Sequence, residues 1–179
     1  MNEEQYSRAN KRVLLAIVVV FGYIAATLML ALVVSQGGHA SKIMMEAVTA
    51  AAVIVISVVA YLGKRTTRTC AVIMTLSMMI GYFVIVQLNT TVGTWTYGLP
   101  LLIAAMVYLD KKIVMMTNGI ALVAIIVHLV RCFLGGGSDL RNNVIGLFVL
   151  LLTAYACNSA ERLLECFFKE NLAEIQNAS

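Results

Sequence analysis

The chain alternates between long apolar runs and short polar links. Six apolar segments of 16 to 22 residues can be marked, namely Val13–Val34, Ala47–Leu62, Ala71–Leu88, Val92–Leu109, Ile113–Val130 and Val144–Ala160. At about 1.5 Å of rise per residue, helices of these lengths match a bilayer core of roughly 30 Å. The pattern predicts an all-α integral membrane protein, a six-helix transmembrane bundle.

The fourth segment is the least regular of the six. The stretch TWTYGLPLLIAAMVYLDKK, Thr94–Lys112, holds the only tryptophan and the only proline. In one interpretation the helix extends back to Val92 and Pro100 kinks it. In the other it begins near Pro100, which suits a first helical turn, and leaves Thr94–Gly98 irregular in the outer leaflet. We favour the kinked span.

Composition agrees with a lipid environment. Hydrophobic residues make up 61% of the 179 residues and charged residues 12%, whereas a soluble domain carries about 25% charge. The lipid bilayer is therefore the first expected partner. The net charge of +4 is spread over short links between apolar runs, a pattern that does not indicate binding to nucleic acid. The first run is too long for a cleaved signal core, so we interpret it as an uncleaved anchor.

The basic residues predict the orientation. Ten of the 13 lysines and arginines fall on one side of the six alternating segments, at Arg8, Lys11, Arg12, Lys64, Arg65, Arg68, Lys111, Lys112, Arg162 and Lys169. Only Lys42, Arg131 and Arg141 fall on the other. Positive residues accumulate on the cytoplasmic side. We therefore expect a multi-pass protein of the inner (plasma) membrane with both termini cytoplasmic.

Candidate chemistry is sparse. The chain has no HExxH, no GxSxG and no glycine-rich nucleotide loop on the cytoplasmic side, and no charged residue stands near the middle of a segment. We expect no enzyme activity, no metal and no cofactor. The four cysteines form no CxxC pair, so we interpret them as packing residues. Asn118 and a few hydroxyls inside the segments are expected to link helices.

Polar and aromatic residues gather at the outer ends of the third, fourth and fifth segments. They are Gln87, Asn89, Trp95, Tyr97, His128 and Arg131. Donors, acceptors and aromatic faces at similar depth suit a small polar ligand. The same residue types also settle at the membrane interface without any ligand. The interfacial belt is the favoured interpretation, and a ligand-binding mouth is the alternative.

The chain becomes polar after Ala160. Within residues 161–179, one helical face carries Leu164, Phe168, Leu172 and Ile175. We divide the chain into a sensor domain, residues 1–160, and the start of a cytoplasmic signalling helix, residues 161–179. The apolar face suits signal transmission through a paired helix, or an amphipathic helix lying on the membrane. A chain ending in such a helix is expected to continue in a longer protein.

Three stretches carry a family resemblance: RANKR (Arg8–Arg12), TYGLPLLIAAMVYLDKK (Thr96–Lys112) and ENLAEI (Glu170–Ile175). They resemble the six-helix membrane region found in some bacterial methyl-accepting chemotaxis proteins. The resemblance implies a sensory input region that forms homodimers through the cytoplasmic helix. It also implies control of a chemotaxis histidine kinase and its adaptor through a coiled-coil output domain.

Two other functions fit the same pattern. One is a small six-helix substrate-binding component of a transporter, and the other is the membrane input domain of a histidine kinase or diguanylate cyclase. The codons after residue 179 would separate them. A long heptad-rich continuation indicates the receptor, a stop codon indicates transport, and a catalytic domain indicates the enzyme input.

Overall fold

The described residues of the computed structural model, 3–34, 40–88, 93–135 and 140–177, are almost entirely helical. The helices, in chain order, are α1 (Glu3–Val34), α2 (Ala40–Lys64), α3 (Arg68–Leu88), the 3₁₀ helix η1 (Thr94–Tyr97), α4 (Gly98–Met106), α5 (Lys111–Leu134) and α6 (Leu140–Asn177). The predicted all-α class is confirmed.

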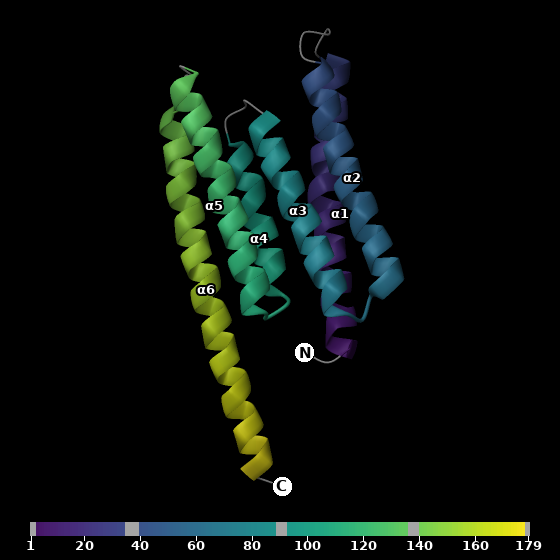
Figure 1. The fold of residues 1–179 in the computed structure, drawn as a ribbon, viewed down its shortest axis with the longest axis vertical. Helices are drawn as coiled ribbons and strands as arrows, with labels where there is room; N and C mark the ends of the chain where they lie inside the picture. The colour runs from purple at the N-terminus through teal and green to yellow at the C-terminus, as the bar shows by residue number, and fades with distance from the viewer. Residues whose placement is uncertain (1–2, 35–39, 89–92, 136–139, 178–179) are drawn as a thin grey trace.

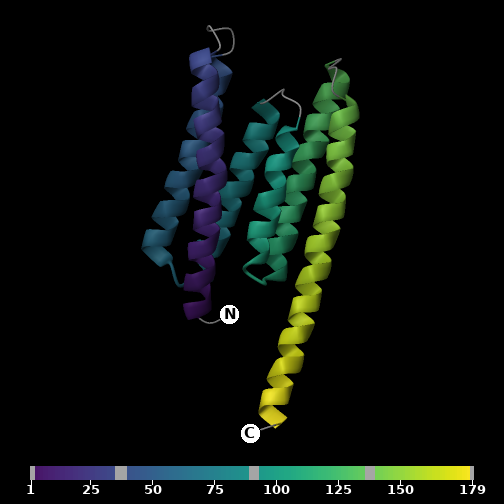
Figure 2. The same cartoon turned by 180° about the vertical axis from the view of Figure 1, so that it is seen from behind.

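Successive helices run in opposite directions along one axis (Figures 1 and 2). The helix α2 packs against α1 and α3, α5 packs between α3 and α6, and α4 contacts α1, α5 and α6. The first residues of α1 and the C-terminal end of α6 lie at the same end of the molecule. We call this end the N-terminal end, and we call the opposite end of the bundle the far end. The helices therefore alternate in direction, as the distribution of the basic residues predicted.

Within the described residues, five helices are long and apolar enough to cross a membrane: α1, α2, α3, α5 and α6. The fourth segment is shorter, with its helical part limited to Thr94–Met106. The prediction of six segments of at least 16 residues is therefore wrong at this position. The chain is compatible with a multi-pass membrane protein in which one segment is a short helix covered by its neighbours.

The favoured kinked helix from Val92 is wrong. Gly93 has φ of 93°, a left-handed conformation that glycine adopts without strain and that a continuous right-handed helix excludes. A 3₁₀ turn follows, and the α-helix begins at Gly98. Pro100 thus falls in its first turn, where the missing N–H has no helical partner to lose. The later start was the right alternative, although the residues before it are 3₁₀-helical and not irregular.

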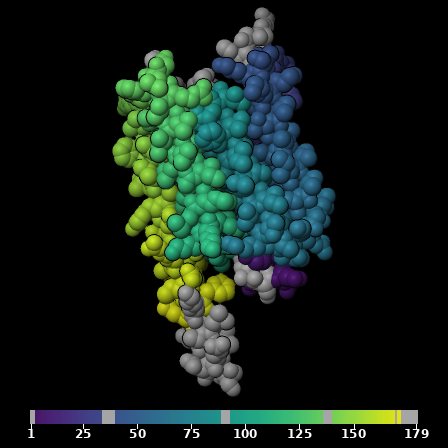
Figure 3. Space-filling view, in the orientation of Figure 1, coloured from purple at the N-terminus to yellow at the C-terminus, as the bar shows by residue number. Residues whose placement is uncertain are grey.

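The last helix is much longer than its apolar run. The 38 residues of α6 correspond to about 57 Å, nearly twice the thickness of a bilayer core. Its final part extends beyond the other helices at the N-terminal end (Figures 1 and 2), and in the space-filling view the yellow surface of α6 continues below the green surface of α5 (Figure 3). The expected continuation of the sixth helix beyond Ala160 is confirmed, whereas its cytoplasmic location stays a prediction. We call residues 161–177 the exit helix.

Small and amide side chains let the helices approach. A Cβ added at Gly81 would overlap the side chain of Val53, and the hydroxyls of Ser57 and Ser77 lie 3.2 Å apart. The α2–α3 contact is therefore a close one, as a small residue every four positions allows. Asn118 of α5 donates through Nδ2 to the Ala154 carbonyl of α6 at 3.3 Å. Its predicted linking role is confirmed.

Candidate functional site

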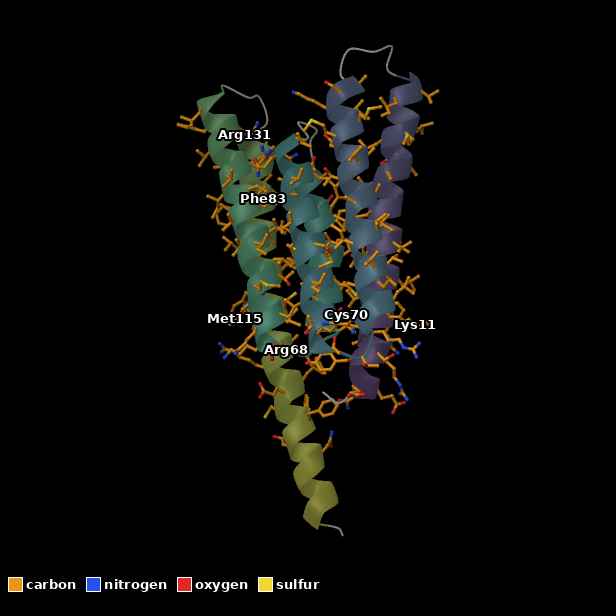
Figure 4. The ribbon with its side chains drawn as sticks, turned by 45° about the vertical axis from the view of Figure 1, so that its right-hand side comes forward. Lys11, Arg68, Cys70, Phe83, Met115 and Arg131 are labelled. Carbon is orange, nitrogen blue, oxygen red and sulfur yellow. The ribbon has the colours of Figure 1, made fainter. Side chains whose placement is uncertain are left out.

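Gln87 and Arg131 form a clamp between α3 and α5 at the far end. Arg131 donates to the backbone oxygen of Gln87 at 2.8 Å and to its side-chain oxygen at 3.3 Å. Gln87 in turn donates through Nε2 to the Ala124 carbonyl at 2.9 Å. Figure 4 shows Arg131 far from Lys11 and Arg68, which lie at the N-terminal end. Arg131 thus supplies a donor for the Gln87 carbonyl in the last turn of α3, where the backbone carbonyls of a helix have no partner within the helix.

His128 extends this cluster towards α6. Its Nε2 lies 3.6 Å from the Cys132 sulfur, one turn further along α5. Asn143, in the first turn of α6, donates to the same sulfur at 3.3 Å. Cys132 and Asn143 did not stand out in the sequence. The spacing of four residues between His128 and Cys132 places them on one helical face and was the one sign that they could interact. Nothing in the sequence indicated that Asn143 would join them.

Trp95 faces α6. Its indole packs on Gly146, where an added Cβ would come within 2.7 Å of the ring. The backbone carbonyl of Trp95 accepts a hydrogen bond from the Tyr82 hydroxyl of α3 at 3.2 Å. The buried indole Nε1 has no hydrogen-bond partner among the described residues. η1 therefore connects α3 to the outer part of α6.

Tyr97 faces the opposite side of the bundle. It lies within electrostatic range of Tyr23 on α1 and Glu46 on α2. Only 4% of Glu46 is exposed. Glu46 directly precedes the second apolar segment, Ala47–Leu62, but α2 begins at Ala40, so Glu46 lies nearly two turns inside the helix. A carboxylate at such a position is unusual and marks a place where function is to be sought.

The five predicted ligand residues that the structure describes divide into three groups. Gln87, His128 and Arg131 gather between α3 and α5, whereas Trp95 turns to α6 and Tyr97 to α1 and α2. Asn89 lies outside the described residues. Because the polar atoms of Gln87 and Arg131 bond to each other and to the backbone, this part of the cluster resembles a helix clamp more than an open mouth. The ligand role of the set stays a prediction.

The predicted transmission residues lie on the exit helix. Leu164 is 41% exposed and Phe168 54% exposed, and Leu163 and Phe167 beside them are exposed as well. The side chains of Leu172 and Ile175 fall outside the described part of the chain. These four exposed apolar side chains on the exit helix form a surface that a partner could cover.

An apolar groove of about 490 Å³ runs between α4 and α6. Its lining includes Ile103, Met106, Leu152, Ala156 and Ala160. Within the ranges that the structure describes, no three His, Cys, Asp or Glu side chains are arranged to hold a metal ion.

Comparison of the chain with protein-family models, with curated proteins and with solved structures gave no match.

Proposed function

We propose that this bundle is the membrane-embedded sensory input region of a chemotaxis-type signal transducer. The observation that carries the proposal is the continuity of α6. One uninterrupted helix joins Asn143 and Gly146, which contact the far-end groups, to the exposed apolar residues of the exit helix. A rigid helix can transmit a small shift or rotation over its whole length.

The proposed mechanism uses two packings of the bundle. A ligand or a change in the membrane favours one packing only if it interacts differently with the two. The η1–α4 segment is well placed to respond, because Trp95 packs on α6 and Tyr97 lies near Glu46 of α2. Movement of η1 relative to α2 would then displace α6, and the exit helix would carry the displacement to an output domain.

In this proposal the protein lies in the inner membrane with both termini in the cytoplasm, and its partner is a second copy. The apolar groove residues and the exposed residues of the exit helix recur every three or four positions, at Val149, Leu152, Ala156, Ala160, Leu163 and Phe167. That spacing places them on one face of α6. A paired α6 would bury this face both inside and outside the bilayer, and a coiled-coil output would then reach the histidine kinase and its adaptor.

The test joins residues 1–179 to the cytoplasmic part of a characterised chemotaxis receptor and measures kinase activity in membranes. Alanines are inserted after Phe168, where each added residue rotates the following helix by about 100°. We expect one, two or three alanines to alter kinase activity and seven, which nearly complete two turns, to restore it. Equal activity for all four insertions would contradict transmission through α6.

The sensing residues are tested in the same chimaera. Trp95→Ala and His128→Ala should change the basal kinase activity while membrane insertion stays intact. Trp95 packs on Gly146 of α6, and His128 contacts the Cys132 sulfur to which Asn143 of α6 donates. Arg141→Ala is the control, since Arg141 is exposed at the start of α6. Unchanged activity in both variants would leave the interfacial belt as the interpretation of this end.

A further inference from the structure

A groove of about 580 Å³ lies between α1 and α2 at the N-terminal end of the bundle. One part of its lining is basic and the other is apolar. Arg8, Lys11 and Arg12 form the basic part, and Leu15 and Val18 of α1 with Tyr61 of α2 line the apolar part. Figure 4 shows Lys11 at this end of the molecule. The groove is distant from the far-end residues described above.

The basic and apolar residues follow one line along α1. Arg8, Lys11, Leu15 and Val18 are separated by three, four and three positions, a spacing that places side chains on one face of a helix. The distance from Arg8 to Val18 along the helix axis is about 15 Å, which is half of a bilayer core of roughly 30 Å. The groove therefore has the length of one leaflet, with its cations at the headgroup level.

Two of the three cations have no counterion. Arg8 is paired with Glu4, one turn earlier on α1. Among the described residues, the structure shows no hydrogen bond or ion pair for the side chains of Lys11 and Arg12, and both are exposed. No acidic side chain is among the described residues that line the groove. The basic part is therefore complementary to an anion.

A hydrogen bond of Asn10 holds the two walls of the groove together. Asn10 lies beside Lys11 in the sequence, but its side chain is buried in the bundle. It donates through Nδ2 to the Arg65 carbonyl of the α2–α3 link at 2.8 Å. Tyr61 stands in the last turn of α2, just before this link. The packing that forms the groove is thus fixed by contacts within the chain and is present before any ligand binds.

A ligand that fits this groove has an anionic head and an apolar chain. Basic pockets between membrane helices bind phospholipid headgroups in this way. A soluble anion would leave the apolar part of the groove uncovered. A second copy docked about a twofold axis would bring the same basic face against itself. We propose that the groove binds one anionic phospholipid, with its phosphate at Lys11 and Arg12 and an acyl chain along Leu15, Val18 and Tyr61.

Such a lipid would contact α1 and α2 together and stabilise their packing at this end. The site requires that these helices lie in a membrane, but it does not rest on the proposed sensory function. Because the lipid is recognised by its charge and by its chain, the two contributions can be removed separately.

The test titrates the full chain in mild detergent with phosphatidylglycerol or with phosphatidylcholine of the same acyl chains, and counts bound lipids by native mass spectrometry. We expect the first phosphatidylglycerol to bind about tenfold more tightly than phosphatidylcholine. The double variant Lys11→Gln/Arg12→Gln removes both unpaired charges and should remove most of this preference. Val18→Phe fills the apolar part without changing the charge, and it should weaken phosphatidylglycerol binding several-fold.

Lys111→Gln/Lys112→Gln is the matched control. It also removes two exposed basic residues at the N-terminal end, where α5 begins, but neither residue lines the groove. Its preference for phosphatidylglycerol should stay within about twofold of the parent's. Circular dichroism verifies that each variant is folded, and the comparison of the two lipids on the parent chain decides the proposal even where a variant is not.

Four results would overturn the site. The first two are equal affinity of the parent chain for the two lipids and equal losses in the two double variants. The third is displacement of the lipid by inorganic phosphate at constant ionic strength, which would indicate a site for a soluble anion. The fourth is a dimer that excludes phosphatidylglycerol and disappears in Lys11→Gln/Arg12→Gln, which would assign the groove to a second copy.

The measurement needs no output domain. Its failure would therefore leave the proposed sensory function standing, and a negative result with the alanine insertions would leave the lipid site standing.

Discussion

The indole of Trp95 lies directly on Gly146, with no room for a Cβ between the ring and the backbone of α6. Glycine is needed here for close approach, since both residues belong to regions with ordinary right-handed backbone. The contact fixes the short η1–α4 segment against the longest helix of the bundle. It also provides a spectroscopic probe, because Trp95 is the only tryptophan.

Gly146→Ala should displace the indole. Overpacking costs about 1–3 kcal/mol, while replacing glycine by alanine in a helix returns up to about 1 kcal/mol. We expect a net destabilisation of about 1–2 kcal/mol, together with a shift of the Trp95 emission to longer wavelength as the ring becomes more exposed. Denaturation in mild detergent, followed by circular dichroism and fluorescence, measures both effects.

Gly119→Ala is the matched control. Gly119 lies within α5, and an added Cβ there would meet nothing within 4 Å. This variant should gain about 0.5–1 kcal/mol from helix propensity and leave the tryptophan spectrum unchanged. If both alanine variants behaved alike, the close contact between Trp95 and Gly146 would be refuted.

The number of helices and their alternating direction could be predicted from the sequence. Hydropathy marks each apolar segment, and charged residues mark where it ends, without knowledge of the tertiary contacts. Clusters such as Lys111–Lys112 mark the ends of the apolar segments whatever the packing is. The start of α4 could not be predicted in the same way. It depends on the left-handed conformation of Gly93 and on the packing of η1 against α6, and both are set by tertiary structure. Pro100 fits a kink and a first turn equally well.

The site residues show the same limit. The sequence placed Gln87 and Arg131 at similar depth, and they do meet. It grouped Trp95 and Tyr97 with them, although side chains two positions apart on a helix point in different directions. Glu161 belongs to the polar stretch after Ala160, yet it is buried in the structure and lines a cavity with residues of the α4–α5 link. The spacing of polar and apolar residues along one helix does not predict burial that depends on contacts with other helices.

Asp110 has two structural roles, and two substitutions separate them. It is the N-cap of α5, accepting from the Lys112 amide at 3.0 Å, and it pairs with Arg68. Asp110→Asn keeps a capping side chain and loses the ion pair, so we expect a loss of at most about 1 kcal/mol. Asp110→Ala loses both and should cost about 1 kcal/mol more. The free energies of unfolding in detergent measure the difference. Equal losses in the two variants would contradict the capping role.

The Arg68–Asp110 pair should also depend on pH. Burial acts to raise the pKa of Asp110, but the hydrogen bonds from Arg68 and the Lys112 amide prevail, and the pKa lies below its ordinary value of 3.8. A carboxyl group whose pKa is lowered by folding stabilises the fold above the unfolded pKa and stops doing so as the pH falls through the folded one. The parent's advantage over Asp110→Asn should therefore be constant near neutral pH, begin to decline near pH 3.8 and be lost once the pH is below the lowered pKa of the folded state. An advantage that did not decline as the pH was lowered through this range would contradict the pairing.

The native cysteines test the orientation of the bundle. Cys166 is exposed on the exit helix, Cys132 is half-buried near the far end, and Cys70 and Cys157 are buried. A membrane-impermeant maleimide should label Cys166 in inside-out vesicles and not in intact cells. In the Cys166→Ser variant any remaining label should enter from the outside, at Cys132. Labelling of Cys166 in intact cells would place the exit helix outside and reverse the proposed topology.

Pairing of α6 with a second copy predicts which positions of the exit helix can be cross-linked. In a cysteine-free background, Leu164→Cys should form disulfide-linked dimers on mild oxidation, because Leu164 lies on the side of α6 that carries the apolar groove. Arg162→Cys is the control. Arg162 is also exposed, but two positions of separation rotate its side chain by about 200° to the other side of the helix. Strong cross-linking at Leu164 with little at Arg162 is the expected result, at protein-to-lipid ratios low enough to exclude random collisions. Equal cross-linking at the two positions, or none at either, would contradict a dimer formed through this face of α6.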